Sequence, residues 1–270
     1  MTAVTVHPSR VLVVGSTGSV GRLVVEESVA AGYRVRALMR TAAQGRTFSA
    51  NVEAVVGDLT RADTLAEAVA GVDVIIFTHG SNGTSRDMEV VDYGAVRNVL
   101  AVLGSQPARI VLMTLIGITN RESSYNRSTE GLDWKRRSER LVRASGRPYT
   151  IVRPGWFDYN SADESLPVLL QGDLRRSGTP RDGAISRRHI AQLIVASIEC
   201  DAASHTTFEL ISTRGSTPTS LTSLFDPLDP DVRDSIDGVR DEDNMPMSHE
   251  PSRVQEDLAA VIAASNGRAT

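Results

Sequence analysis

The sequence predicts an α/β protein built on a doubly wound, Rossmann-type parallel sheet with helices on both faces. Short apolar runs rich in Val, Ile and Leu alternate with longer segments of helical periodicity as far as residue 155. A glycine-rich turn separates the first apolar run from the first helical segment, which is where such folds bind nucleotides. With 270 residues and 41% hydrophobic content, the chain is long enough for one large core.

Strands and helices can be assigned in chain order. Apolar runs bounded by turn residues predict six strands, at residues 11–14, 34–40, 52–56, 72–77, 109–115 and 149–153. Helical spacing predicts crossover helices at 23–32, 61–70, 89–103 and 131–145, and polar composition predicts loops at 81–87 and 117–129, the second of them mobile. Right-handed crossovers then give the strand order 3-2-1-4-5-6, with a seventh strand possible at 207–211.

The alternation of strands and helices ends after residue 155. Residues 156–184 form an insertion that contains Trp156, Phe157 and Tyr159. Because ligands of open α/β sheets lie beyond the carboxyl ends of the strands, this insertion is a candidate wall of the substrate site, although its aromatic residues could equally be ordinary packing. Two more helices are expected, at residues 186–199 and 254–264.

Three parts of the chain are therefore expected. Residues 1–9 are a disordered lead, and residues 10–215 are the nucleotide-binding domain with its insertion. Residues 216–270 are a small C-terminal portion on the substrate side, read as a loosely ordered tail or cover because residues 216–252 are rich in Asp, Pro and Ser.

Composition narrows the class of protein. A net charge of −4 gives no reason to expect nucleic acid or an anionic membrane as a partner. The one cysteine, Cys200, excludes an intramolecular disulfide and a site of several thiolates, and no metal is expected. No apolar stretch reaches the roughly 18 residues of a membrane helix. We expect a cytoplasmic protein that acts on a small molecule, as a monomer or a homodimer.

The glycine-rich turn carries the functional signal. Gly15, Gly18 and Gly21 are spaced three residues apart between the first strand and the first helix. In a nucleotide-binding turn the first glycine allows the tight bend, the second lets a pyrophosphate approach the backbone, and the third lets the helix pack on the strand. Free N–H groups at the helix start then face the anion. The spacing predicts dinucleotide binding, and the alternative is a purely structural turn.

The stretch from Gly15 to Gly21, GSTGSVG, has the G-x-T-G-x-x-G form of extended and atypical short-chain dehydrogenases/reductases. The chain resembles this family, and its NmrA-like branch, in further segments that occur in the family's order: 35–40, 57–59, 109–114, 135–155 and 185–191. The resemblance covers about residues 10–212 and implies a Rossmann fold that binds NAD(P).

The end of the second strand indicates which cofactor is bound. NAD-binding proteins place Asp or Glu there to bind the ribose 2′-hydroxyl, whereas this chain has Arg40 followed by Thr41. A guanidinium suits a 2′-phosphate, and Arg36 is expected to add charge on the same face of the strand. We therefore expect NADP(H), the alternative being that Arg40 is only a solvated strand end.

The resemblance places further contacts around the cofactor. Asp58 and Leu59 correspond to the adenine side, although Asp58 could instead cap a turn, and His79 is expected to face the ligand without a catalytic role. The complete set of expected cofactor-binding residues is Gly15, Ser16, Thr17, Gly18, Ser19, Val20, Gly21, Arg40, Thr41, Asp58, Leu59, Thr78, His79, Gly80, Lys135, Pro154, Gly155 and Trp156.

The catalytic residues follow the family only in part. The resemblance implies a tyrosine acid/base four residues before a lysine, together with a Ser or Thr that polarises the substrate carbonyl. Lys135 and Thr114 fit the lysine and hydroxyl positions, but the tyrosine position is Gly131. Tyr125 could reach the site only if its loop folds inward, and Asp133 is nearer but not equivalent. The candidate catalytic residues are Lys135, Thr114 and Tyr125.

The expected function is that of an NADPH-dependent oxidoreductase, an enzyme that reduces a small carbonyl, a quinone or an activated alkene. Two alternatives stay open: a non-catalytic NADP(H)-binding redox sensor, and an epimerase or dehydratase that uses bound cofactor. Lys135 could also be a plain surface charge, since Arg136, Arg137 and Arg140 share its helix.

Overall fold

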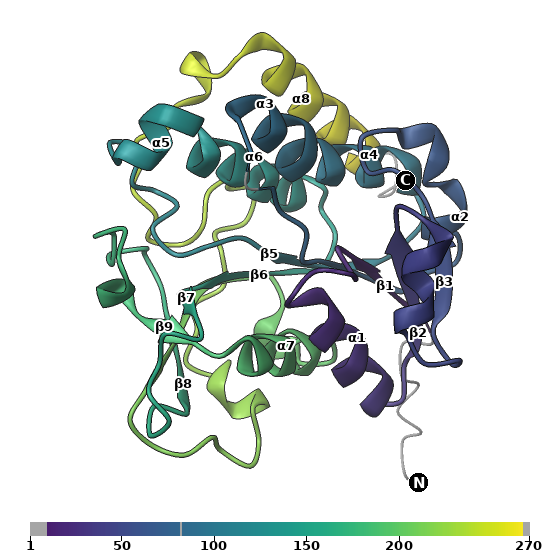
Figure 1. Ribbon diagram of the computed structural model, residues 1–270. Coiled ribbons are helices and arrows are strands. Elements are labelled where there is room, and N and C mark those ends of the chain that lie inside the picture. The colour runs from purple at the N-terminus through teal and green to yellow at the C-terminus, as the bar shows by residue number, and fades with distance from the viewer. Residues whose placement is uncertain (1–9, 82, 267–270) are drawn as a thin grey trace, which may run out of the picture.

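The computed structural model describes residues 10–81 and 83–266, so the expected lead at residues 1–9 lies outside the described residues. An eight-stranded sheet lies between two layers of helices (Figure 1). The strand order is β3-β2-β1-β4-β5-β6-β10-β8. The strands are β1 (Arg10–Val14), β2 (Arg34–Met39), β3 (Glu53–Val56), β4 (Val74–Phe77), β5 (Arg109–Met113), β6 (Tyr149–Pro154), β8 (Leu166–Leu170) and β10 (Thr206–Thr213).

The predicted order of the first six strands is confirmed, and β10 is the seventh strand expected near residues 207–211. These seven strands run parallel to one another, and apart from the edge strand β3, where Ala54 and Val56 are exposed, their apolar residues are buried on both faces. The insertion supplies an unexpected eighth strand, β8, which pairs antiparallel with β10. It also supplies β7 (Trp156–Phe157), which pairs with β9 (Ala184–Ile185) in a separate two-stranded sheet.

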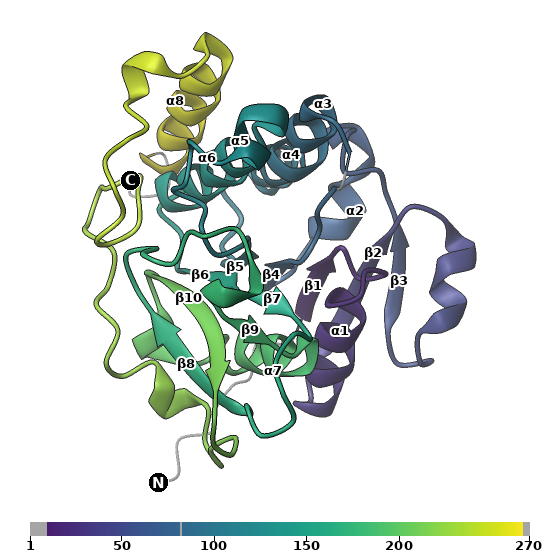
Figure 2. The same cartoon turned by 60° about the vertical axis from the view of Figure 1, so that its left-hand side comes forward.

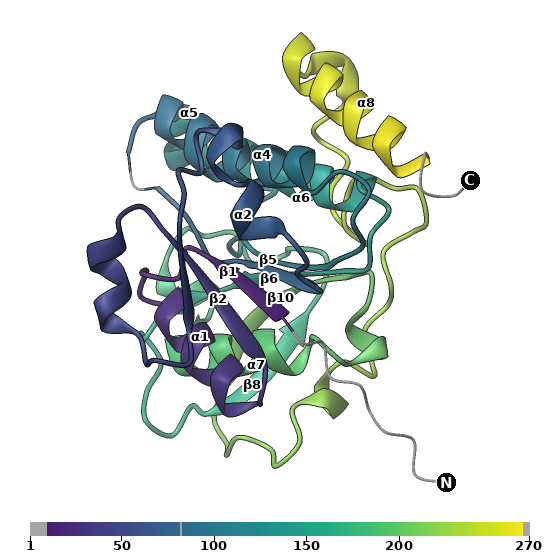
Figure 3. The same ribbon diagram turned by 90° about the vertical axis from the view of Figure 1, so that its right-hand side faces the viewer.

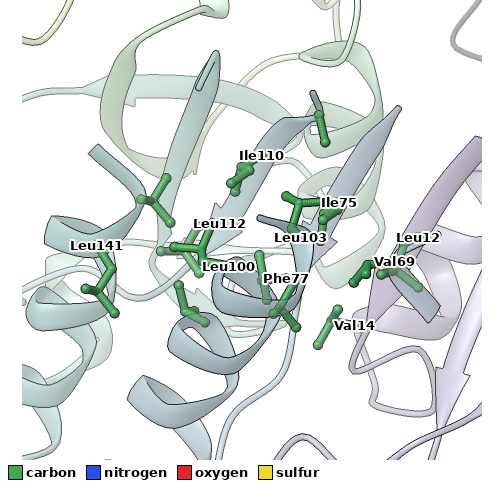
Figure 4. Packing of buried hydrophobic residues seen from close by; sticks show 14 of the residues in the cluster. Leu12, Val14, Val69, Ile75, Phe77, Leu100, Leu103, Ile110, Leu112 and Leu141 are labelled. Atoms are coloured by element: carbon green, nitrogen blue, oxygen red, sulfur yellow. The ribbon is translucent and has the colours of Figure 1, made fainter. Parts of the chain in front are cut away.

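Helices cover the two faces of the sheet in the arrangement typical of a doubly wound fold. Figures 1 and 3 show α1 (Gly21–Ala30) and α7 (Arg187–Ala196) on one face. The other face carries α2 (Ala66–Val69), α4 (Gly94–Leu103) and α6 (Gly131–Ala144), and α8 (Ser252–Asn266) lies outside this layer. In Figure 4, strand side chains such as Ile75, Phe77 and Leu112 lie against Leu100, Leu103 and Leu141 of the helices.

Three predicted segments differ in detail. The helix expected at 61–70 is two short pieces, η2 (Ala62–Thr64) and α2, and the helix expected at 89–103 begins as a π-helix, η3 (Met88–Tyr93), after the one-turn helix α3 (Ser85–Asp87). The stretch expected as a mobile loop contains α5 (Ser124–Thr129), whose start is capped by the Ser123 side chain, which accepts a hydrogen bond from the Asn126 N–H.

The C-terminal tail is bound firmly to α6. Helix α6 carries four arginines, Arg136, Arg137, Arg140 and Arg143, and all four are buried. They form ion pairs with tail carboxylates, those of Asp231, Asp237 and Glu250. In Figure 2 the tail follows the outside of the molecule up to α8. Residues 229–250 contain little regular secondary structure, and ion pairs with α6 hold them in place.

Candidate functional site

A cleft of about 880 Å³ opens at the carboxyl ends of β1, β2, β4 and β5. This is the edge at which open α/β sheets bind ligands. It brings together most of the residues expected from the sequence: Gly15, Thr17, Gly18, Ser19, Val20, Arg40, Asp58, Leu59, Thr78, His79, Gly80, Thr114, Tyr125 and Lys135. Apolar lining comes from Leu38, Met39, Val91, Met113, Leu115 and Phe157.

The glycine turn has the close packing that a dinucleotide cradle requires. Gly15 has φ +83°, and a Cβ atom there would lie 2.6 Å from the backbone nitrogen of His79. A Cβ on Gly21 would lie 2.0 Å from the Gly15 carbonyl oxygen, so helix α1 can approach the turn only with glycine at this position. Gly18 and Ser19 line the cleft just before α1 begins, which leaves the N-terminal end of that helix facing the cleft. The turn therefore fits a pyrophosphate.

Arg40 lies exposed on the cleft at the end of β2. Asp58, which follows the adjacent strand β3, accepts hydrogen bonds from the Thr60 N–H at 2.9 Å and the Thr60 hydroxyl at 2.8 Å. These bonds, with smaller contributions from Arg61 and Arg40, hold the pKa of Asp58 below its usual value. Asp58 thus caps its turn while lining the cleft.

Arg36 does not add charge to the cofactor side, contrary to expectation. Its guanidinium is buried and donates to the carbonyl oxygens of Glu67, Ala68 and Ala70 at the end of α2, and it pairs with Glu53. Arg36 therefore holds α2 and β3 against β2.

Six residues of the expected cofactor set do not line the cleft: Ser16, Gly21, Thr41, Pro154, Gly155 and Trp156. The buried Ser16 hydroxyl donates to the Leu38 carbonyl at 2.6 Å and so closes the turn onto β2. Gly155 is packed so closely that a Cβ would lie 2.4 Å from the Gly183 carbonyl oxygen. Trp156 points to Tyr159 in an edge contact, and its neighbour Phe157 lines the cleft instead.

Lys135 forms a buried ion pair that sequence reasoning missed. Its ammonium contacts the Asp92 carboxylate, and the two side chains are 13% and 2% exposed. The other Asp92 oxygen accepts hydrogen bonds from the Ser81 N–H at 3.0 Å and the Ser81 hydroxyl at 2.6 Å. Lys135 is therefore an anchored group of the cleft and not a solvated surface charge. No local pattern in the sequence indicated Asp92, a buried residue of the π-helical segment η3 whose partner Lys135 lies 43 positions away.

The hydroxyl of Thr114 is directed away from solvent to Glu139. Thr114 Oγ1 donates to Glu139 Oε1 at 2.7 Å, and both side chains are buried. Glu139 also accepts from Arg153, at 3.0 and 2.7 Å, and from Arg143 at 3.2 Å. The single hydroxyl proton of Thr114 is thus used within the protein, which leaves the Thr114 oxygen as an acceptor.

Tyr125 fills the space beside Gly131. Its phenol oxygen lies 2.6 Å from the position that a Cβ atom of residue 131 would occupy, so a tyrosine at 131 and the observed Tyr125 exclude one another. Tyr125 reaches the cleft from α5 and remains 43% exposed. Burial of its ring raises the pKa of the phenol, against a smaller opposite effect of the Thr129 hydroxyl.

Two further groups complete the site. His79 Nε2 lies 3.2 Å from the Asp92 carbonyl oxygen, which identifies Nε2 as the protonated nitrogen, and burial lowers the pKa of the ring. At the rim, Arg187 of α7 donates to the Ser19 hydroxyl at 3.1 Å and pairs with Asp158. The insertion is thereby joined to the glycine turn.

The fold and this cleft define an NAD(P)-binding Rossmann protein of the atypical short-chain dehydrogenase/reductase type. A family model described as NAD(P)H-binding matches residues 15–201, and the chain belongs to that family. In the described parts of the chain we find no helix suited to crossing a membrane, and no group of three or more His, Cys, Asp or Glu side chains that could hold a metal ion.

Relatives of known sequence carry several names. An uncharacterized sugar epimerase, YhfK of Bacillus subtilis, is 29% identical over 215 residues, which cover 77% of this chain and 96% of that protein. Isoflavone reductase homolog P3 of Arabidopsis thaliana is 29% identical over 184 residues, or 64% of this chain. The chain spans 56% of the length of that second protein.

Solved structures agree on the fold. A putative NAD-dependent epimerase/dehydratase from Bacillus halodurans matches with a TM-score of 0.68 at 22% identity, covering 80% of this chain and 98% of that one. A short-chain dehydrogenase/reductase from Veillonella parvula, solved in complex with NADP, matches with a TM-score of 0.58 at 14% identity, covering 78% and 99%. At such identities the similarity shows the fold alone.

Proposed function

We propose that this protein is an NADPH-dependent reductase of a small carbonyl compound, quinone or activated alkene. The observation that carries the proposal is the single cleft that joins the glycine turn, Arg40, and the group of Lys135, Thr114 and Tyr125. We assign cofactor and substrate binding to residues 10–215, and we assign the tail at 216–270 a supporting role because none of its described residues, 216–266, lines the cleft.

Arg40 supports the preference for the phosphorylated cofactor. A guanidinium at the end of β2 can form two charge-assisted hydrogen bonds with a 2′-phosphate. No carboxylate follows β2 that could accept bonds from a free ribose 2′-hydroxyl, since the next residues are Arg40 and Thr41. Asp58 belongs to the neighbouring strand end, where its oxygen is bound by Thr60.

The roles of the other residues follow from their contacts. When bound, the nicotinamide cofactor supplies the hydride chemistry. Lys135, held in place by Asp92, would bind the hydroxyls of the nicotinamide ribose, and the Tyr125 phenol would hold the proton that a reduced substrate needs. Thr114 would accept a hydrogen bond from a ligand N–H or O–H, because its own proton is donated to Glu139. Met113, Leu115 and Phe157 would exclude water.

A non-catalytic NADP(H) sensor is the second candidate. It is favoured by the glycine at position 131, because the resembled enzymes carry their tyrosine acid/base at this position and this chain has no side chain there. Some relatives are named as epimerases. An epimerase, which oxidises and then reduces its substrate and so regenerates its bound cofactor, is therefore a third function to be tested.

Two measurements decide between these functions. Calorimetric titration with NADPH and NADH is expected to show binding, and the absence of heat with both would remove the proposal. Absorbance at 340 nm with a panel of aldehydes, ketones, quinones and enones is then expected to show NADPH oxidation. Tight NADPH binding without turnover across the panel would favour the sensor, and sugar-nucleotide isomerisation without net NADPH consumption would favour the epimerase.

A further inference from the structure

We infer that Asp92 is a positioning residue that offsets the charge of Lys135 and thereby keeps the Tyr125 phenol, the proton donor in reduction, protonated up to a higher pH than a free lysine would allow. The inference rests on the proposed function, because it assigns Tyr125 the acid role within it. Its physical basis is the placement of three groups on three different elements: Tyr125 and Lys135 line one cleft, and the buried Asp92 contacts Lys135.

The Tyr125 phenol lies beside α6, the helix that carries Lys135. Residues 131 and 135 are four apart in a helix, so their side-chain positions lie one turn above each other. The Tyr125 oxygen occupies the position beside residue 131, and Lys135 and Tyr125 both line the cleft. A free ammonium in this place would favour the phenolate, so that the phenol would lose its proton at a lower pH.

Asp92 cancels that effect. Its carboxylate contacts the Lys135 ammonium, and the Asp92 side chain is almost completely buried, where a charge interacts strongly. Two hydrogen bonds from Ser81 hold the second carboxylate oxygen and fix Asp92 in position. The carboxylate therefore offsets the positive charge of Lys135 beside the cleft.

The other charged groups that line the cleft do not replace the positive charge of Lys135 that Asp92 offsets. The titratable residues that line the cleft together with Tyr125 are Arg40, Asp58, His79 and Lys135. Arg40 and Asp58 lie at the far end, after β2 and β3. His79 stays neutral because burial lowers its pKa, and Glu130, next to Gly131, is exposed and lies 3.4 Å from the Ser85 hydroxyl. Burial and the Asp92 charge accordingly both raise the pKa of Tyr125.

Titration of the phenol tests the inference without cofactor or substrate. The chain has five tyrosines, and tyrosinate absorbance near 295 nm in the protein minus that in Y125F isolates Tyr125. The same difference between D92N and D92N/Y125F is expected to titrate at least about one pH unit lower, a roughly tenfold larger acid dissociation constant. D92E, which restores the carboxylate, is expected to return the titration toward that of the unaltered protein.

A second variant, K135Q, tests the inference if D92N does not fold. In K135Q the Asp92 charge remains without its partner, and the Tyr125 titration is expected to move to higher pH. Unchanged Tyr125 titration in folded D92N, or in folded K135Q, overturns the inference.

The activity profile supplies the link to catalysis. In D92N the pH at which reduction declines is expected to fall together with the titration of Tyr125. A decline at unchanged pH, despite a shifted titration, would show that Tyr125 is not the donor and would overturn its acid role. Absence of turnover in the unaltered protein would count against the proposed reductase function alone, since the titration stands independently of it.

Discussion

Arg153 on β6 and Asp241 in the tail form a two-point ion pair, with Nη1–Oδ1 and Nη2–Oδ2 distances of 2.7 and 2.6 Å and side-chain exposures of 0% and 1%. Arg153 also binds Glu139, which accepts the Thr114 hydroxyl bond. Asp241 is thereby connected, through the side chains of Arg153 and Glu139, to Thr114, which lines the cleft. The described part of the tail, residues 216–266, thus contacts the buried side of the site, and none of its residues lines the cleft.

The ion pair predicts a large effect of D241N on stability. Removing one partner of a buried ion pair costs about 3–5 kcal/mol when the other charge is left unpaired. In D241N the Arg153 guanidinium keeps Glu139 and Glu209 as partners, so we expect the free energy of unfolding measured with urea to fall by less, about 1.5–3 kcal/mol, the worth of hydrogen bonds to a charged group. D243N changes an exposed carboxylate of the same segment and is the matched control, expected to shift the free energy by less than about 0.5 kcal/mol. Equal values for the two variants would contradict the bracing role.

The contact between Gly131 and Tyr125 predicts a double-mutant effect. Alanine is normally better than glycine in a helix by about 1 kcal/mol, yet an alanine Cβ at 131 would lie 2.6 Å from the Tyr125 oxygen. We expect G131A to destabilise the protein or to displace Tyr125, and to lower turnover while NADPH binding is kept. In the Y125A background the same substitution should be stabilising. Additive behaviour of the two substitutions would show that the contact is absent in solution.

The buried pair of Lys135 and Asp92 predicts opposite effects of single and double substitutions. K135M leaves the Asp92 carboxylate buried without its cation, and we expect a loss of about 3 kcal/mol of stability along with turnover. K135M/D92N removes both charges and should regain most of the stability without regaining activity. Thermal melting and NADPH oxidation measure the two properties separately. Full stability in K135M would mean that Asp92 is not held by this contact.

Glu209 predicts a pH dependence of stability. Burial raises its pKa from 4.5 to about 7, against the opposing charge of Arg153, 3.3 Å away. A raised pKa means that the folded state binds the proton more tightly than the unfolded state. Its contribution to stability is therefore complete below pH 4.5 and is lost as the pH rises through about 7.

The matched variant for this effect is E209Q, which keeps the shape of the side chain without its titration. We expect the stability of the unaltered protein relative to E209Q to fall by the order of 3 kcal/mol between pH 4.5 and 7. Denaturant unfolding at several pH values measures the difference. A constant difference over this range would contradict the shifted titration.

The sheet could be predicted from the sequence because its strands are short apolar runs buried on both faces, as at Ile75 and Ile110. The arginines of α6 could not be placed, because a run of charges at helical spacing usually marks a solvated face, and their acidic partners lie about a hundred residues downstream. The same limit applies to Asp92, whose partner Lys135 is 43 positions away. Local pattern reveals burial of apolar residues, whereas burial of charge depends on distant complementary charge.

Arg40 predicts cofactor preference, and this prediction tests the proposed function most directly. Charge-assisted hydrogen bonds to phosphate contribute about 1.5–3 kcal/mol, so R40A should weaken NADPH binding about 10- to 100-fold. NADH lacks the 2′-phosphate, so its affinity should change little. R46A removes an equal charge from the exposed 3-10 helix η1 (Ala42–Thr47), outside the lining of the cleft, and should leave both affinities unchanged. Calorimetry at two salt concentrations would separate the local contact from general attraction, because screening weakens long-range attraction more than a direct contact. Equal losses for NADPH and NADH in R40A would show that Arg40 supports the end of β2 and does not recognise a phosphate.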